Sequence, residues 1–192
     1  EPLISSTYLL EDAAEAYAEL QTEENRPLMV LLTYPVAAVE DLLGRTITIT
    51  SDPRPKMEGV LDVGIIGAGN FATSVHLPNL QRMQDRYRIH TICDIHPPTA
   101  LQAATRFRAV RQSSDAQEVC RDPDIDVVII TTRHDQHAPL AMLAAENGKA
   151  VFCEKPMGVN RDETLVLAKK LMDTKTPYLV GFNRRFSPAI RE

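Results

Sequence analysis

The stretch "GIIGAGNFA", Gly64 to Ala72, decides the fold of this chain. It continues an apolar run that is predicted to be a buried strand. It also opens the segment 70–83, "NFATSVHLPNLQRM", predicted to be a helix in which Pro78 introduces an irregularity. A glycine-containing turn between a strand and a helix is typical of folds that bind the phosphates of a dinucleotide.

Each residue of this turn has its own predicted task. Gly67 permits the tight turn, Gly69 lets a pyrophosphate approach the backbone, and Ala72 lets the helix pack on the strand. The start of the helix also supplies free N–H groups and the positive end of a helix dipole. Gly67, Gly69, Asn70, Phe71 and Ala72 are therefore predicted to bind the pyrophosphate.

The acid expected to bind the ribose is Asp94, at the end of the next predicted strand and 22 residues after Ala72. A carboxylate there accepts hydrogen bonds from the 2′- and 3′-hydroxyls of NAD and repels the 2′-phosphate of NADP. The alternative is an ordinary turn aspartate before "HPP". Arg88 and Arg106 are too remote in sequence to be assigned to a 2′-phosphate. The sequence predicts NAD, with NADP the less favoured cofactor.

Outward from this turn, strands and helices alternate, which predicts an α/β Rossmann fold: a doubly wound parallel sheet with helices on both faces. The run "DVVIITT" is almost continuously β-branched, as expected of a strand buried on both faces. Gly148 is expected to end one helix, and Asn160 with Glu163 to begin the next with a capping box. Strands are predicted at 61–66, 88–93, 109–110, 126–132, 150–154 and 177–182, and helices at 70–83, 97–107, 113–120, 136–149 and 160–173.

Composition excludes several classes of protein. The chain has 192 residues, 44% hydrophobic and 24% charged, as in globular proteins. It has no apolar run of the roughly 20 residues that a membrane-spanning helix needs, and no basic stripe for nucleic acid. Cys93, Cys120 and Cys153 lack metal-ligand spacing, so no metal site or disulfide framework is predicted. A cytoplasmic location is expected, with Cys153 a core residue rather than a reactive thiol.

Charge divides the chain near residue 60. Residues 1–60 hold 11 acidic and 4 basic residues, a balance of −7, whereas residues 61–192 hold 15 and 17, a balance of +2. The first part contains a predicted helix at 11–20, a strand at 27–33, and "GRTITITSDPRPKMEG", which reads as a strand that leads into a linker. These few elements cannot bury a core alone. With no signal peptide and no initiating Met, the chain is expected to be a fragment or a processed form.

Two loops follow predicted strands at the edge where a parallel sheet binds its ligands. The first, "TTRHDQHAP", contains His134, Asp135 and His137. A zinc site is one interpretation of these three side chains, and a helix cap or a packing role is another. The second loop, in "VFCEKPMGVN", places Glu154, Lys155 and Pro156 directly after an apolar run. Lys155 is either a functional amine, with a cis peptide bond before Pro156 as a further constraint, or a surface lysine paired with Glu154.

Three stretches together carry a family resemblance: "GIIGAGNFATSVHLPNL", "TTRHDQHAPLAMLAAENGKAVFCEKPM" and "VGFNRRFSP". Over about residues 60–188 the chain resembles the nucleotide-binding half of the Gfo/Idh/MocA oxidoreductases, the family of glucose–fructose oxidoreductase and inositol dehydrogenase. The "EKP" motif after a "GK-x-V" strand is its most specific element. The resemblance implies that Lys155 reaches the nicotinamide and the substrate, that Glu154 is the acid of the motif, and that His137 is the histidine of the loop after the fourth strand.

The resemblance also has departures. Where a common family pattern reads Thr-Pro-Asn, this chain has Thr132, Arg133 and His134, so the usual packing on the nicotinamide is altered. This variant resembles a subgroup in which the module follows a zinc-type alcohol dehydrogenase module, and residues 1–35 are similar to the C-terminal tail of medium-chain dehydrogenases. The predicted domains are accordingly residues 1–35 as that tail, 36–59 as a linker, and 60–188 as the NAD-binding domain.

The resemblance implies an NAD-dependent dehydrogenase that passes a hydride between the nicotinamide and a hydroxyl-bearing carbon of a sugar or nucleotide-sugar. Lys155 and His137 are the expected catalytic residues, and Thr131, Thr132, His137 and Glu154 the expected contacts at the nicotinamide end. Family members carry a further Asp and His in a downstream substrate domain, so this chain alone is expected to be inactive, and a homo-oligomer is expected to form through that domain. The alternatives are a non-catalytic NAD-binding sensor or scaffold and an NADP-dependent reductase.

Overall fold

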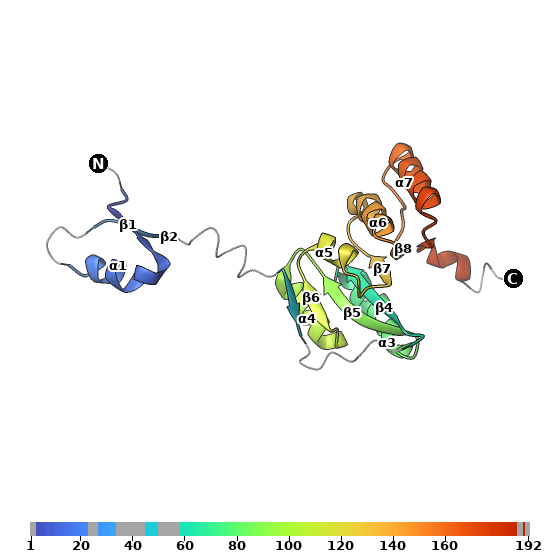
Figure 1. Cartoon of the computed structure of the whole chain (residues 1–192), viewed down its shortest axis with the longest axis horizontal. Helices are drawn as coiled ribbons and strands as arrows, with labels where there is room; N and C mark the ends of the chain where they lie inside the picture. Colours follow the sequence, from blue (N-terminus) through green and yellow to red (C-terminus); the bar gives the residue numbers. More distant parts are fainter. Residues whose placement is uncertain (1–2, 23–26, 34–44, 50–57, 188–189, 191–192) are drawn as a thin grey trace. The chain divides into compact units, whose positions relative to one another are not determined.

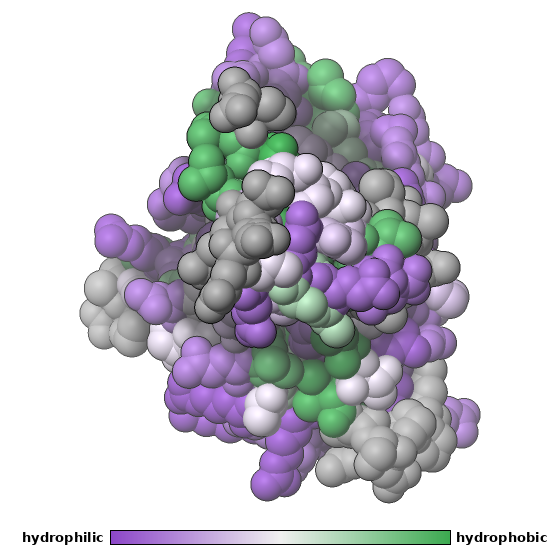
Figure 2. Space-filling view, turned by 90° about the vertical axis from the view of Figure 1, so that its left-hand side faces the viewer, coloured by the Kyte–Doolittle hydropathy of each residue, from purple (hydrophilic) through white to green (hydrophobic). Residues whose placement is uncertain are grey.

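A computed structural model of the chain describes residues 3–22, 27–33, 45–49, 58–187 and 190. The chain divides into two compact units, Glu1–Gly44 and Arg45–Glu192, each described separately below. No helix within the described ranges is long and apolar enough to cross a membrane. Much of the surface seen in Figure 2 is hydrophilic, with apolar patches between the polar side chains.

The first unit is a small β-α-β arrangement. Strand β1 (Ser6–Leu9) pairs in parallel with β2 (Val30–Thr33), and η1 (Leu10–Asp12) with α1 (Ala13–Leu20) connects them. The predicted helix and the second strand are confirmed, whereas β1 was not predicted. Ala16 is buried, but large apolar side chains such as Leu28 remain exposed, so the described part of this unit has little core of its own.

The second unit is built on a seven-stranded sheet in the order β3-β6-β5-β4-β7-β8-β9 (Figure 1). Every pair is parallel except that between β3 and β6. Without β3, this is the strand order of a doubly wound Rossmann sheet, which confirms the predicted fold. The strands are β3 (Thr46–Thr48), β4 (Leu61–Ile66), β5 (Tyr87–Cys93), β6 (Arg111–Ser113), β7 (Val127–Ile130), β8 (Ala150–Cys153) and β9 (Tyr178–Val180).

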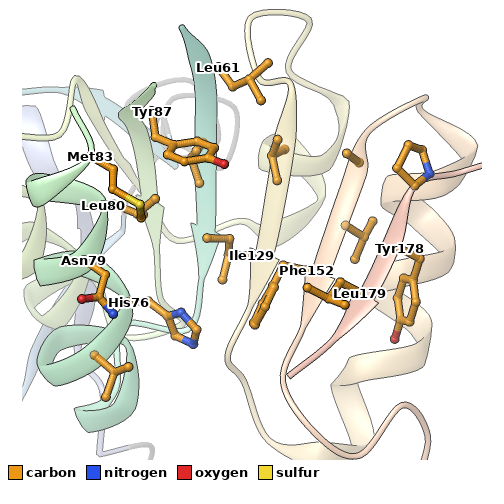
Figure 3. A pocket seen from close by; sticks show the side chains of 16 residues that line it. Leu61, His76, Asn79, Leu80, Met83, Tyr87, Ile129, Phe152, Tyr178 and Leu179 are labelled. Carbon is orange, nitrogen blue, oxygen red and sulfur yellow. The ribbon is translucent and has the colours of Figure 1, made fainter. Parts of the chain in front are cut away.

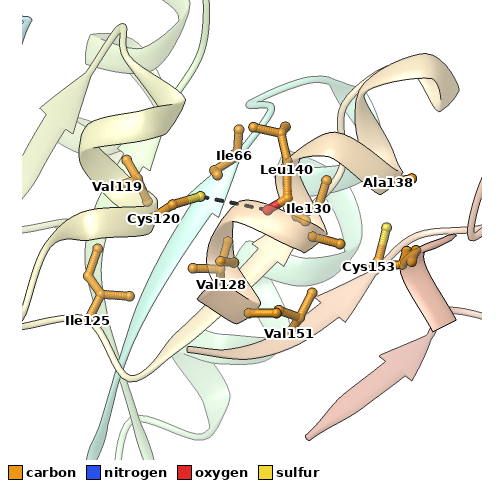
Figure 4. Close-up of a cluster of buried hydrophobic side chains, with 14 of the residues drawn as sticks. Ile66, Val119, Cys120, Ile125, Val128, Ile130, Ala138, Leu140, Val151 and Cys153 are labelled. Carbon is orange, nitrogen blue, oxygen red and sulfur yellow. Dashed lines mark hydrogen bonds between the residues drawn. The ribbon is translucent and has the colours of Figure 1, made fainter. Parts of the chain in front are cut away.

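Helices pack on both faces of this sheet because the strands are apolar on both faces, although one face of β7, β8 and β9 stays open. Ile65 packs with α3 (Leu77–Arg82) and α4 (Pro97–Phe107), while its neighbour Ile66 packs on the other face (Figure 4). This alternation follows from the two-residue period of a strand. The helices of the second face are α5 (Ala116–Arg121), α6 (His137–Glu146) and α7 (Arg161–Thr174). The short turn η3 (His134–Gln136) precedes α6, and the short turn η4 (Asn183–Phe186) follows β9.

Several local predictions can be compared with the structure. Gly148 follows α6 at φ +72°, and the Asn160 side chain accepts from the Glu163 N–H at 2.8 Å to begin α7, as expected. One prediction was wrong, because the third parallel strand is β6 rather than residues 109–110. The strand predicted within "GRTITITSDPRPKMEG" is confirmed at residues 46–48, where β3 pairs with β6 on the edge of the sheet. Both strands are three residues long, β3 on the edge of the sheet and β6 between β3 and β5, and their pairing depends on residues distant in sequence.

The three cysteines are free and buried. Burial raises the pKa of each thiol, Cys93, Cys120 and Cys153, to about 12. The thiolate is the reactive form, so these side chains are inert in the folded state. The prediction that Cys153 is a core residue is confirmed, and the described residues contain no cluster of His, Cys and acidic side chains that could hold a metal.

Charged groups gather around the starts of the central strands, away from the glycine turn. Asp62 is fully buried, and its Oδ2 accepts from Nη2 of Arg88 at 2.8 Å. His90 is buried beside this pair, with Nδ1 4.0 Å from Oδ2 of Asp122. Burial lowers the pKa of His90 below its ordinary value; Arg111 and Arg88 lower it further, while the acids Asp122 and Asp62 oppose the shift.

This environment predicts a pH-dependent stability. Because the pKa of His90 is lower in the folded than in the unfolded chain, the unfolded chain binds more protons below about pH 6.5. Stability should therefore fall as the pH drops from 7.5 towards 5.5, and the fall should be smaller in His90→Gln. Urea unfolding of both proteins at the two pH values measures this difference. An equal loss in the two proteins would contradict the assignment.

Candidate functional site

The candidate site lies where the carboxyl ends of β4, β7 and β8 meet. Within the sheet, β5 and β6 lie on one side of β4, and β7, β8 and β9 lie on its other side. The strand order therefore reverses between β4 and β7. Ligands of doubly wound sheets bind at this point. The glycine turn follows β4, and the two predicted loops follow β7 and β8.

Gly67 brings the glycine turn into contact with the loop after β7. Its φ is +98°, and a Cβ atom would lie 2.8 Å from the carbonyl C and O of Thr131 and 2.9 Å from the N of Thr132. Only glycine fits such an approach. The Thr131 hydroxyl donates to the Gly67 carbonyl at 2.6 Å, and the Gly67 N–H donates to the Cys93 carbonyl at 2.8 Å. The structure therefore places Gly67, Thr131 and Thr132 together, as predicted.

Gly69 faces open space, since a Cβ atom added there would meet nothing within 4 Å. The Thr73 N–H donates to the Gly69 carbonyl at 3.0 Å, which is the first hydrogen bond of the helix. The amides of Asn70, Phe71 and Ala72 therefore lie at the helix start, where N–H groups lack intrahelical partners. Ala72 is buried against the strand. Open space over a glycine and free amides fit the predicted pyrophosphate.

The helix that starts here is irregular. Residues 72–76 form a π-helix, η2 (Ala72–His76), which runs into α3 just before Pro78. Pro78 has no N–H to donate to the preceding turn, and its ring would clash with the carbonyl four residues earlier. A wider turn relieves that clash, and such turns are common at functional sites. The predicted irregularity at Pro78 is confirmed.

Asp94 joins the glycine turn directly. Its Oδ2 accepts from the Ala68 N–H at 2.9 Å, and its Oδ1 from the His96 N–H at 3.0 Å. A carboxylate offers about four lone-pair positions, so both oxygens can still accept hydroxyls. The half-buried carboxylate thus lies at the carboxyl end of β5, next to the turn, where a ribose would meet it.

His137 is buried, and its ring bridges the two loops. Nδ1 lies 2.7 Å from the Pro156 carbonyl oxygen, and Nε2 lies 3.1 Å from the Thr132 carbonyl oxygen. Both nitrogens therefore face backbone acceptors rather than open space. His137 is accordingly placed to position the loops, and its predicted direct contact with a cofactor or substrate has no support from this geometry.

The "EKP" motif lies directly after β8. The Lys155–Pro156 peptide bond is cis, as predicted. Lys155 is exposed, and its Nζ has no hydrogen bond or ion pair with any residue that the structure describes. Glu154, in contrast, is turned inward: its Oε1 lies 2.9 Å from Nε2 of His76, and its Oε2 accepts from the Lys155 N–H at 3.3 Å. The alternative interpretation, a Lys155 amine paired with Glu154, has no support among these described contacts.

His76 was missed by the sequence analysis. The sequence places His76 in the predicted helix but gives no sign of its partner Glu154, which is 78 residues away. The ring lies at the end of an apolar groove of about 580 Å³ on the open face of β7, β8 and β9, and it points towards Phe152 (Figure 3). Other side chains that line the groove are Leu80, Ile129, Tyr178 and Leu179.

Comparisons with known proteins agree with this geometry. Residues 61–182 match the model of the Gfo/Idh/MocA oxidoreductase family, NAD-binding Rossmann fold. The chain is 37% identical to an inositol 2-dehydrogenase of Rhizobium meliloti over 65% of its own length and 37% of the relative's. It is 34% identical to a scyllo-inositol 2-dehydrogenase (NAD(+)) of Bacillus subtilis, over 69% and 39%.

A solved structure of the same kind is that of a myo-inositol dehydrogenase of Lactobacillus casei in complex with NAD(H) and myo-inositol. It matches with a TM-score of 0.65 and 27% identity, over 69% of this chain and 39% of that one. The second unit thus contains an NAD-binding Rossmann domain, and the chain belongs to the Gfo/Idh/MocA oxidoreductase family. It spans about two fifths of the length of the relatives it matches.

Alanine substitutions of the two glycines of the turn are expected to have different effects on the stability of the domain. Gly67→Ala should destabilise the domain by more than the roughly 1–2 kcal/mol of a residue forced to positive φ, because the added Cβ also meets the backbone at Thr131. Gly69→Ala should leave stability within about 0.5 kcal/mol and weaken NAD binding, because its Cβ enters only the open space. Urea unfolding and calorimetric NAD titration of both variants measure this. Loss of stability in Gly69→Ala would contradict the assignment.

Proposed function

We propose that this chain supplies the cofactor half of an NAD-dependent dehydrogenase that transfers a hydride between the nicotinamide and a hydroxyl-bearing carbon of a sugar, inositol or nucleotide-sugar. The observation that carries the proposal is the exposed Lys155 amine, which has no hydrogen bond or ion pair among the described residues and lies on the sheet edge that also holds the glycine turn and Asp94. Relatives named as inositol dehydrogenases support the class of substrate.

The residues that would hold NAD follow from the site. The amides at Asn70 to Ala72 would bind the pyrophosphate, with Gly69 leaving room for it. Asp94 would accept the ribose hydroxyls, and its negative charge would repel a 2′-phosphate. Thr131 and Thr132, held against Gly67, would line the path towards the nicotinamide. When bound, NAD supplies the acceptor for the hydride.

Lys155 would act on the substrate oxygen. An ammonium group donates a hydrogen bond to the reacting hydroxyl or carbonyl oxygen, and it stabilises negative charge that develops there as hydride leaves or arrives. A sensor or scaffold would need no exposed amine at this place. Because the chain spans two fifths of its relatives' length, we propose that the rest of the substrate site comes from outside it and that this chain alone binds NAD without turnover.

The first unit is proposed to be the C-terminal tail of a zinc-type medium-chain dehydrogenase module that precedes the Rossmann domain. Its separation as a compact unit supports this proposal, as do its parallel β-α-β arrangement and its sparse core. A small two-stranded unit of this kind is not expected to be stable alone.

Cofactor choice is predicted to depend on the charge of Asp94. Calorimetric titration of the chain should show tighter binding of NAD than of NADP. Asp94→Asn keeps an acceptor for the Ala68 N–H but removes the charge, so the preference should fall by roughly tenfold, the free energy of about one charged hydrogen bond. Equal affinity for NAD and NADP in the unaltered chain would contradict the ribose assignment.

Lys155→Ala in the full-length enzyme should lower kcat by roughly 10²-fold or more, the loss typical of one donor to a developing charge. The affinity for NAD should change little, because other residues hold the phosphates and the ribose. Steady-state kinetics with inositols as substrates, and an NAD titration, measure both quantities. Lys169→Ala, an exposed lysine on α7, is the matched control. A kcat near that of the unaltered enzyme would make Lys155 a structural residue.

A further inference from the structure

The carboxylate of Glu154 is enclosed although it lies next to an exposed lysine. The side chains of His76 and Glu154 are only 14% and 15% exposed, and their contact is 2.9 Å long. The second carboxylate oxygen accepts from the backbone N–H of Lys155. Both oxygens of the Glu154 side chain therefore have a hydrogen-bond partner. One partner is the His76 ring, from a helix on the face of the sheet, and the other is the Lys155 N–H in the "EKP" turn.

The His76 ring is itself fixed in place. Its centroid lies 5.3 Å from that of Phe71 and 5.2 Å from that of Phe152, and both contacts are edge-on. Phe152 and Glu154 are two residues apart in β8 and its continuation, so their side chains leave the same face of the sheet. The π-helix η2 ends at His76, in the turn that the irregularity at Pro78 requires.

Gly181 closes the other side of the carboxylate. A Cβ atom at this residue would lie 2.8 Å from Oε1 of Glu154 and 2.9 Å from both Cδ and Oε2. The Gly181 N–H donates to the Cys153 carbonyl at 2.8 Å, and the Glu154 N–H donates to the Ile130 carbonyl at 2.9 Å. The backbone on both sides of the carboxylate is thus held by the sheet, and only a residue without a side chain leaves the carboxylate its place.

We propose that His76 and Gly181 are positioning residues for Lys155: with Glu154 they form a carboxylate clamp that fixes the peptide from which the Lys155 side chain projects. The clamp rests on the proposed function, since it aims Lys155 at the nicotinamide end of NAD. His76 donates through Nε2 to Oε1, Gly181 leaves room for the carboxylate, and Oε2 holds the Lys155 N–H.

A structural role alone accounts poorly for this arrangement. A buried polar pair contributes little net stability, and apolar residues of similar volume often serve folding as well. The apolar groove beside His76 already supplies such surroundings. A histidine and a carboxylate at this point instead give the Lys155 peptide a fixed hydrogen-bond acceptor, which an apolar side chain cannot provide.

The test measures how fast the amine of Lys155 reacts with acetic anhydride, by mass spectrometry of the full chain, with and without saturating NAD. A hydrogen bond to a charged amine is worth roughly tenfold or more, so bound NAD should slow acetylation of Lys155 by about that factor. ADP-ribose, which lacks the nicotinamide, should not. Lys169 on α7, paired with Asp173, is the internal reference.

Three variants separate the possibilities. His76→Met fills the space without a donor, Gly181→Ala displaces the carboxylate from the opposite side, and His76→Gln keeps a donor near the position of Nε2. We expect the first two to bind NAD yet to lose the protection of Lys155, and His76→Gln to keep it. Gly181→Ala requires only the end of a flexible side chain to move, so it remains informative if His76→Met fails to fold.

Each outcome decides between the hypotheses. Protection that survives in both His76→Met and Gly181→Ala overturns the clamp, as does loss of protection in His76→Gln equal to that in His76→Met. If NAD binds to the unaltered chain without protecting Lys155, the amine is not aimed at the nicotinamide end, and the clamp is overturned, whereas the kcat of Lys155→Ala tests the proposed role of the amine separately. If NAD does not bind at all, the cofactor assignment itself is wrong.

Discussion

The close approach of Gly67 to the backbone at Thr131 is the constraint on which the site depends. Two strand ends can meet at this distance only because Gly67 has no side chain, and the Thr131 hydroxyl then joins the two turns with a hydrogen bond. The contact sets the distance between the helix start after β4 and the loop after β7. The proposed place of the pyrophosphate, and with it that of the rest of NAD, depends on this distance.

The two ends of the sheet differ in the kind of polar group that they contain. At one end, Asp62, Arg88 and their neighbours form buried charge contacts that fasten the starts of the strands. At the other end, the backbone supplies most of the polar groups: free amides, the carbonyls that hold His137, and a peptide held by Glu154. The charges at the first end are paired with one another, whereas the amine of Lys155 is exposed and has no partner among the described residues.

Sequence was sufficient for structural features that depend on neighbours along the chain. The turn at Gly67, the acid at Asp94 and the cis bond before Pro156 are local features with local signatures. His76 was not predictable, because its partner becomes a neighbour only when β8 is laid beside the helix after β4. His137 is in the expected loop, but its ring turns towards two carbonyls that periodicity alone does not locate.

Strand β3 belongs to the second compact unit but lies before the region that the family shares. The family match begins at residue 61, but residues 46–48 pair with β6 and cover what would otherwise be an open edge of the sheet. A protein cut at the start of the shared region would expose a row of unpaired backbone groups, and such rows invite association between chains. In this chain the three-residue strand β3 forms that edge instead, so the segment before the shared region decides which backbone groups the edge presents to other chains.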